Sequence, residues 1–368
     1  MKRAYILTVS LLLALLLLAG CMPAEDFRPS DTTKDDGFNI PIDTGDEDTQ
    51  KETAVKTGSY SFTEGQYYYF FAKYLKAFSD GYSDEELKQL GFDSSVSLKK
   101  QKTKDGRIWY DVFRDLTVDY MWDILVGCEK CDEEGIGLSS AESAYIETSL
   151  NSAASYLGMS ASEYVKAMYG GNVSYGEYID ALKLEYRYEK YVEALNKLYL
   201  EDLGDAEIAA YVEKLEGEKD MTLTRNVMYV GIEGEGGEKL LSDFLAGEKT
   251  EAALRELATA ASFGEIGTRE DCVKGELSAE FDEWLFSEDR RVGDAALVST
   301  EDEDGKYTCL MFFSSEGRPV CYLSAMSQMA DENREAQLEL LKEKYPLEKN
   351  EEILASLNAC PGSGIDLK

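Results

Sequence analysis

The chain has 368 residues and a formal net charge of −34, with 72 acidic residues against 38 basic ones and no histidine. A chain of this length can bury two separate cores, and its excess of carboxylates excludes the basic surface that nucleic acids need. Without histidine, Ser-His-Asp and Cys-His nucleophiles and histidine-ligated metal sites are excluded as well. We therefore expect no nucleic-acid partner, no metal and no cofactor.

The first 21 residues have the pattern of a signal peptide. The basic start Met1-Lys2-Arg3 precedes an almost wholly apolar run over residues 4–20, which is too short and wrongly flanked for a lasting transmembrane helix. The small residues before Cys21 resemble a bacterial lipobox, which implies cleavage and lipid attachment at Cys21. A covalent anchor would also overcome the repulsion between an acidic chain and an anionic membrane. We expect a lipoprotein on the outer side of the bacterial cell membrane; the alternative is ordinary signal cleavage with an incidental cysteine.

Residues 22–58 are rich in Asp, Glu and Thr, contain Pro23, Pro29 and Pro41, and show hardly any apolar periodicity. A segment of this composition cannot bury enough apolar surface to offset its chain entropy, and its like charges keep it extended. The sequence predicts a disordered acidic tether that gives the body reach from the membrane.

Residues 59–220 are predicted to form a helical module. No proline occurs between Gly58 and Gly317, which favours long regular elements. After a short lead-in at 60–63, an aromatic stripe at helical spacing is expected to be core rather than a ligand site. Its members are Tyr67, Phe71, Tyr74, Leu75 and Phe78. A second amphipathic helix is expected over residues 108–126.

Three Ser-x-x-Glu patterns mark later helix starts, because Ser and Glu at this spacing satisfy two backbone donors of the first turn. They are Ser139 with Glu142, Ser160 with Glu163, and Ser174 with Glu177. The third pattern opens a helix of about 25 residues, and one more short helix is expected over residues 205–215.

Residues 221–324 change from helical to mixed patterning, in which strand-like runs alternate with amphipathic helical patterns. In order, these are a strand at 224–230, helical patterns at 240–245 and 254–258, a glycine-bracketed turn at 264–267, a helix at 279–286, and strands at 295–299 and 307–313 around an Asp304-Gly305 turn. The expected fold class of the whole chain is α+β.

This series of elements resembles the parvulin family of peptidyl-prolyl cis-trans isomerases. The residues that carry the resemblance are Arg225-Asn226-Val227-Met228 in the place of the family's Arg-His-Ile-Leu strand, Gly264-Glu265-Ile266-Gly267, Lys274-Gly275-Glu276-Leu277, Phe281 with Phe286, and Gly293-Asp294. The resemblance implies a four-stranded antiparallel sheet wrapped by helices. It also implies an apolar substrate-binding cup for proline, formed by Leu277, Phe281 and Phe286, for which ordinary core packing is the alternative.

In the parvulin family two histidines contribute to the polar floor of this cup. Their positions here are Asn226 and Thr308, which can hydrogen-bond but cannot replace an imidazole network; Ser262 would lie near the third polar position. The resemblance therefore implies an isomerase-like domain of weak or absent activity. An active isomerase is the alternative, because prolyl isomerisation breaks no covalent bond and needs only a shaped pocket.

Residues 59–220 resemble the N-terminal helical region of the SurA/PrsA class of extracytoplasmic foldases. The resemblance lies in Phe62-Thr63 before a Tyr-rich helix, Glu133-Glu134-Gly135-Ile136 before a capped helix, and Tyr164-Val165-Lys166-Ala167-Met168-Tyr169-Gly170. Such proteins place helices before, and often after, a parvulin-like module, and here a helical pattern over 330–344 is ended by Pro346. We expect residues 325–368 to pack back on the helical module.

Together these resemblances imply a membrane-anchored foldase or chaperone whose partners are unfolded or proline-containing exported polypeptides. A cell-surface binding or envelope-assembly lipoprotein is the alternative from another class. A homodimer through the helical module stays open.

The body also contains a Cys-x-x-Cys pair, Cys128 and Cys131. Export would permit a disulfide, but the pair follows a helical pattern and precedes acidic residues, which disfavour a reactive thiolate. We expect a disulfide or free surface thiols rather than a redox centre.

Overall fold

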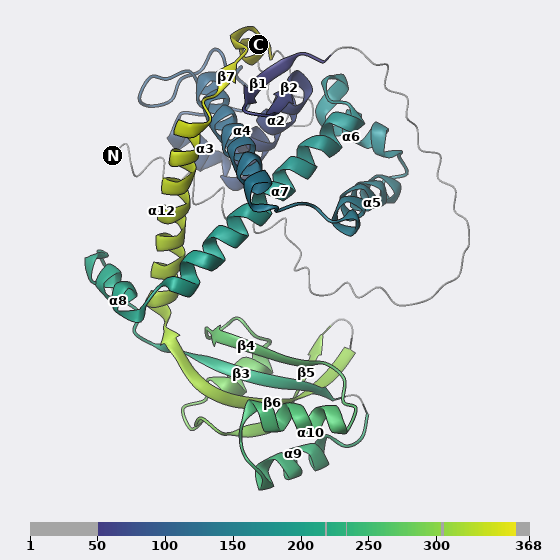
Figure 1. Cartoon of the computed structure of the whole chain (residues 1–368), viewed down its shortest axis with the longest axis vertical. Helices are drawn as coiled ribbons and strands as arrows, with labels where there is room; N and C mark the ends of the chain where they lie inside the picture. Colours follow the sequence, from purple (N-terminus) through teal and green to yellow (C-terminus); the bar gives the residue numbers. More distant parts are fainter. Residues whose placement is uncertain (1–50, 218, 233, 303–304, 358–368) are drawn as a thin grey trace. The chain divides into compact units, whose positions relative to one another are not determined.

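The computed structural model describes residues 51–357, except 218, 233 and 303–304 (Figure 1). Cys21 and residues 22–50 of the expected tether lie outside the described residues. The chain divides into two compact units: unit 1 is Met1–Asn196 with Arg334–Lys368, and unit 2 is Lys197–Asn333. Each unit contains helices and an antiparallel sheet, so the expected α+β class is confirmed.

The divisions between the units fall within two long helices, α7 (Tyr175–Asp202) and α12 (Val320–Lys344). The sequence pattern instead changes near residues 220 and 324. A helix that is continuous across a boundary shows no change of periodicity there, which is why the pattern alone places the boundary elsewhere.

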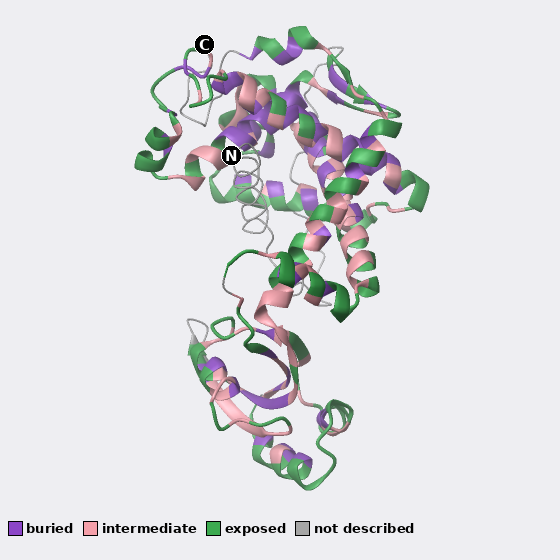
Figure 2. Cartoon of the chain, turned by 90° about the vertical axis from the view of Figure 1, so that its left-hand side faces the viewer, coloured by how far each residue is buried: buried purple, intermediate pink, exposed green. Residues whose placement is uncertain are grey.

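Unit 1 consists mainly of helices around one core. The chain enters through a hairpin of β1 (Thr53–Thr57) and β2 (Tyr60–Thr63), and β7 (Glu348–Lys349) adds a third strand beside β1. The helices are α2 (Glu64–Gly81), α3 (Asp84–Leu90), α4 (Trp109–Glu134), α5 (Ser140–Tyr156), α6 (Ala161–Tyr169), the 3-10 turn η1 (Gly170–Asn172), α13 (Glu351–Ser356) and parts of α7 and α12. Buried residues follow the inward faces of these helices (Figure 2).

Strand β1 corrects the expected extent of the tether. The sequence predicts disorder up to residue 58, yet Ala54 and Val55 are fully buried. Val55 pairs with Phe62 on one side and with Lys349 on the other. A strand this short has no periodicity to read, and its partner β7 comes from the far end of the chain.

The aromatic stripe of α2 lies in the core, as predicted. Tyr67, Phe71 and Leu75 are fully buried. The ring centroid of Phe78 lies 5.1 Å from that of Phe92 and 5.3 Å from that of Trp109, within the range for favourable aromatic pairs. Because large rings bury more apolar area than any other side chains, this stripe anchors unit 1.

All three predicted capping boxes form. Ser139 and Ser160 each accept a hydrogen bond from the backbone of the Glu three residues later, and each Glu side chain accepts one from the backbone of its Ser. Ser174 and Glu177 make the same two bonds at the start of α7, at 3.2 and 3.1 Å. The local pattern therefore fixed where these helices begin.

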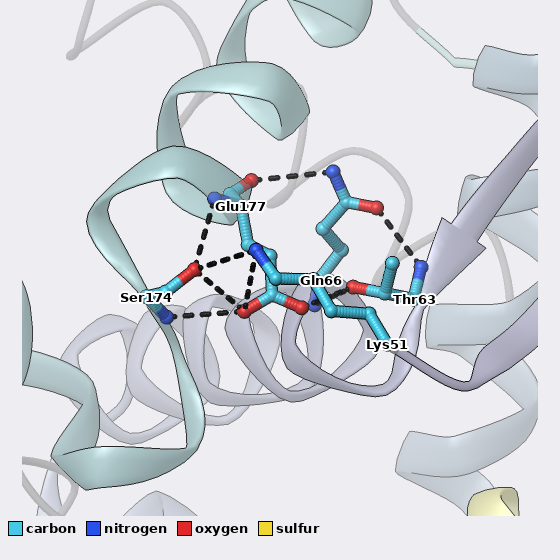
Figure 3. Close-up of polar contacts among 5 residues, drawn as sticks. All are labelled: Lys51, Thr63, Gln66, Ser174 and Glu177. Carbon is cyan, nitrogen blue, oxygen red and sulfur yellow. Dashed lines mark hydrogen bonds and ion pairs between the residues drawn. The ribbon is translucent and has the colours of Figure 1, made fainter. Parts of the chain in front are cut away.

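The Glu177 box extends into a polar cluster that joins two helix starts (Figure 3). Its carboxylate accepts a hydrogen bond from the Thr63 hydroxyl at 2.6 Å, and Thr63 is itself the N-cap of α2. The Gln66 amide donates to the Glu177 carbonyl at 3.2 Å, and the Lys51 ammonium lies 3.8 Å from the carboxylate. The cluster thus fastens the start of α7 to the start of α2.

Unit 2 contains a four-stranded antiparallel sheet with strand order β4-β3-β6-β5. The strands are β3 (Leu223–Ile232), β4 (Ile266–Cys272), β5 (Ala295–Asp302) and β6 (Gly305–Pro319); the helices are α8 (Asp205–Lys214), α9 (Gly237–Ala246), α10 (Glu251–Ala260) and α11 (Ala279–Leu285). The expected four-stranded antiparallel sheet is therefore present. Strand β6 runs beyond the predicted 307–313 and leads directly into α12, while part of the predicted Asp304-Gly305 turn lies outside the described residues.

The two faces of this sheet pack against different helices, and Figure 1 shows α9 and α10 beside the sheet. Successive side chains of a strand point to opposite faces, so Met228, Leu310 and Phe312 pack with α9 and α10. Their neighbours Val227, Met311 and Phe313 pack on the other face with α11. We call the second face, with the helix over it, the α11 face.

Candidate functional site

The α11 face carries apolar side chains that reach solvent. Leu277 and Phe281 are half-buried against its core cluster. The Phe281 ring meets Tyr307 of β6 edge-to-face, with centroids 5.7 Å apart, and Tyr307 is 42% exposed. Tyr229, Leu277 and Phe281 are partly buried at the edge of the same apolar cluster, and Tyr307 packs on the Phe281 ring. We call these four residues the α11 surface.

Phe286, the third predicted member of the proline cup, has a different environment. The Arg225 guanidinium lies 5.4 Å from its ring centroid and 5.0 Å from that of Phe313. The same guanidinium donates to the carbonyls of Leu285 and Ser287 at the end of α11. A cation at this position satisfies terminal carbonyls and complements the helix dipole, so Phe286 helps to anchor α11 to the sheet.

Asn226, at the first family histidine position, has its amide engaged within the fold. Its Nδ2 donates to the Ser315 hydroxyl at 2.9 Å, and its Oδ1 accepts the Asp271 backbone N–H at 2.6 Å. Asp271 has a left-handed φ of 50°, and its carboxylate accepts from Thr224 and from the Arg318 backbone at 2.6 and 2.8 Å. Asn226 therefore holds a strained, bulged strand end in place.

Thr308, at the second family histidine position, lies far from Asn226. Asn226 pairs with Ser315, whereas Thr308 pairs with Ile232, six residues further along β3, a separation of about 20 Å at the usual rise per residue. Alternation from Cys309 and Leu310 also places Thr308 on the α9/α10 face, where its hydroxyl lies 2.7 Å from that of Ser299. The expected polar floor shared by Asn226 and Thr308 is not formed, because the strand register separates them.

Ser262, the residue expected near the third polar position, is exposed in the turn after α10, with a φ of 55°. The structure thus brings Leu277 and Phe281 together on the α11 face. It places Phe286 at the end of α11 and keeps Asn226, Thr308 and Ser262 in three other environments.

Tyr229 and Glu265 form a polar pair on the α11 face that the sequence motifs do not predict. The Tyr229 hydroxyl donates to Glu265 Oε1 at 2.9 Å. Tyr229 lies opposite Gly267, where any added Cβ would overlap its ring, so the second glycine of the predicted turn leaves room for this tyrosine. Burial and the hydrogen bond to Glu265 raise the pKa of Tyr229 to about 12. The signal in the sequence is the turn Gly264-Glu265-Ile266-Gly267 opposite an aromatic strand residue, and this signal can only be used once the pairing is known.

The described cysteines are free thiols, and four of the five are buried. Burial raises the pKa of Cys309 to about 11 and also raises that of Cys272, so both remain protonated at neutral pH. Cys128 and Cys131 are buried in unit 1, where their thiols donate to the Leu184 and Arg187 carbonyls at 3.5 and 3.4 Å. The expected disulfide or surface exposure of this pair is wrong, because both thiols face α7.

Neither a metal site nor a membrane span occurs within the part of the chain that the structure describes. No group of three or more acidic or cysteine side chains there is placed to hold a metal ion. Of the helices between residues 51 and 357, none is long and apolar enough to cross a bilayer.

No protein-family model and no curated protein matches this chain. Among solved structures, the chain is similar to one from a study of PEB4 and Cj1289, two SurA-like chaperones of Campylobacter jejuni. The identity is 12% and the TM-score is 0.27, over 81% of this chain and 98% of the other. It is also similar to the foldase PrsA of Lactococcus lactis, at 9% identity and a TM-score of 0.25, over 83% and 97%, and to PrsA of Bacillus anthracis, at 11% identity and 0.22, over 62% and 96%. Superpositions this loose leave the function to be inferred from the chain's own residues.

Proposed function

We propose that this protein is a membrane-anchored extracytoplasmic foldase or chaperone that binds unfolded, proline-containing exported polypeptides. The signal peptide pattern and Cys21 support export and lipid anchoring. The observation that carries the binding role is the α11 surface, where the half-buried Leu277 and Phe281 and the exposed Tyr307 present an apolar area beside an antiparallel sheet. Such an area can take up apolar or prolyl side chains of an extended peptide.

The same domain has weak or absent isomerase activity in this proposal. The barrier to prolyl rotation is about 20 kcal/mol, and a catalyst lowers it only through contacts that are stronger in the twisted state. The chain has no histidine, the Asn226 amide is occupied by Asp271 and Ser315, and Thr308 belongs to the opposite face. The α11 surface can hold a proline more easily than it can favour its twisted form.

A protease-coupled assay on Ala-Pro peptides, run beside an aggregation assay with an unfolded client, tests this proposal on the mature chain. We expect turnover close to the uncatalysed rate and suppression of client aggregation. Absence of both activities, with recovery of one folded partner from the envelope, would instead support an envelope-assembly lipoprotein.

An active isomerase is the second candidate, and the Tyr229–Glu265 pair favours it. The Tyr229 hydroxyl lies on the same face as Phe281, and its pKa of about 12 keeps it protonated. Its one proton would reach the twisted peptide by exchanging the hydrogen bond to Glu265 for one to the substrate. Turnover well above background that is lost in Tyr229→Phe, but kept in Asn226→Ser, would establish this candidate.

A further inference from the structure

A second solvent-facing apolar area lies in unit 1, along one face of α5 and in the turn that follows it. Tyr145 is 57% exposed, Tyr156 is 91% exposed, and Leu157 and Met159 in the following turn are 55% and 40% exposed. We call these four residues the α5 tip. Large apolar side chains scattered singly on a surface need no explanation, but four of them on one helix face and its adjoining turn indicate an interaction site.

The geometry of α5 gathers these side chains on one side. Ile146, Leu150 and Ala154 recur every four residues and are buried in the core of unit 1. Tyr145 and Tyr156 are eleven residues apart, which is close to three full helical turns, so they share one outward face. The α5 tip is therefore an exposed stripe on a helix whose inward face is already used.

The α5 tip is also without free charge in a strongly acidic chain. From Thr148 to Ser162 no residue is charged, the longest such run after the N-terminal leader, although the chain as a whole has a net charge of −34. Glu142, the charged residue on the same face, is paired with Lys190 at 2.8 Å. Partners that attract by charge are thus disfavoured at this site, and an uncharged, apolar medium is favoured.

The exposure of Tyr156 distinguishes a bilayer from a peptide as that medium. A side chain that is 91% exposed stands clear of the surface, so an extended peptide could contact it from one side only. A bilayer interface can surround it, and tyrosine is suited to that depth because its ring is apolar and its hydroxyl stays hydrated.

We propose that the α5 tip inserts shallowly into the bilayer interface, so that the helical unit docks on the membrane. This inference rests on the membrane anchoring included in the proposed function. Leu157 and Met159 would enter the acyl boundary while Tyr145 and Tyr156 lie at the headgroups. A lipid at Cys21 would raise the local concentration of the membrane, so even a weak contact would be populated.

Fluorescence quenching in the lipidated full-length protein tests the contact directly. Tryptophan is placed at the tip in Tyr156→Trp and at a matched exposed position in Leu340→Trp, which is 59% exposed on α12 beside charged residues. In phosphatidylcholine vesicles with brominated acyl chains, we expect Tyr156→Trp to be quenched and blue-shifted and Leu340→Trp to be unchanged, after subtraction of the wild-type signal. Equal quenching at the two positions would overturn the proposal.

Vesicle flotation of the mature chain lacking the lipid at Cys21 distinguishes membrane contact through the α5 tip from lipid anchoring and from client binding. We expect the triple variant Tyr156→Ser/Leu157→Ser/Met159→Ser to lose about ten-fold in partitioning to phosphatidylcholine vesicles, with Leu340→Ser unchanged and helical content equal by circular dichroism. If the triple variant partitions to vesicles as the wild type does, the tip does not contact the membrane, and the foldase proposal is unaffected. If the variant also fails to suppress client aggregation, the tip binds polypeptides instead. If partitioning depends on the tip and the protein is found to carry no lipid at Cys21, the membrane contact of the tip is supported and the lipid anchor is overturned.

Discussion

The two faces of the unit 2 sheet use the same strands in different ways. On the α9/α10 face, Phe244 and Phe312 are buried with ring centroids 4.9 Å apart, and further apolar side chains pack around them. On the α11 face, Tyr229 and Phe281 remain half-buried. The α9/α10 face thus packs its large rings inside the fold, whereas the α11 face leaves the rings of Phe281 and Tyr307 in reach of solvent.

Buried polar atoms show the same contrast. Ser278 Oγ, Asp282 Oδ1 and Trp284 Nε1, all in or beside α11, have no hydrogen-bond partner among the described residues. A buried polar atom without a hydrogen-bond partner costs stability. The other such atoms in the described part of the chain lie outside α9 and α10. Three buried polar atoms without a partner thus gather in or beside α11, the helix that also presents Phe281.

The largest effect is expected from breaking the stable face. Phe244→Ala should lower the free energy of unfolding by about 3–5 kcal/mol, because it leaves a cavity in a closed apolar cluster. Urea denaturation of the mature chain measures the loss. Peptide affinity per folded molecule should stay unchanged; a specific loss of affinity would mean that the two faces are not separate in function.

The next largest effect is expected at the strand end that Asn226 holds. Asn226→Ala should destabilise the protein by about 1–3 kcal/mol, because the Asp271 backbone N–H loses its acceptor. Ser315→Ala is the matched control and should cost less, since it removes only the partner of Nδ2. A variant at Asn226 with normal stability but no peptide binding would restore this residue to the site.

On the open face, Phe281→Ala should weaken binding of an Ala-Pro peptide about ten-fold while lowering stability by only about 1 kcal/mol. Isothermal titration and urea denaturation give the two numbers. Phe286→Ala is the control, because Phe286 is a half-buried aromatic at the end of the same helix whose contact is with Arg225. If both variants lose affinity equally, the α11 surface is not the binding site.

The smallest effect expected is on pH dependence. Peptide affinity should be constant from about pH 6 to about pH 9, because no histidine is present to titrate near its usual pKa of about 6.5. Burial holds the Cys309 thiol protonated until the pH rises through about 11, and Tyr229 until about 12. Fluorescence titration at several pH values checks this, and a step near neutrality would reveal a titrating group that the α11 surface does not contain.

Much of the helical structure could be predicted from local patterns. The serines at 139, 160 and 174 cap their helices because the capping bonds span only three residues. The stripe from Tyr67 to Leu75 identified the core face of α2 by its period. The absence of histidine, which excludes whole classes of chemistry, needs no structure at all.

The site could not be predicted to the same extent, because it depends on the pairing of distant strands. Motif spacing places Asn226 and Thr308 in equivalent roles, but the β3–β6 register separates them and period-two alternation sends Thr308 to the other face. The same register brings Tyr229 opposite Gly267 and close to Glu265. Residue types and helix starts follow from the sequence because they depend on near neighbours, whereas the composition of a sheet face is decided by which residues, far apart in the chain, become partners.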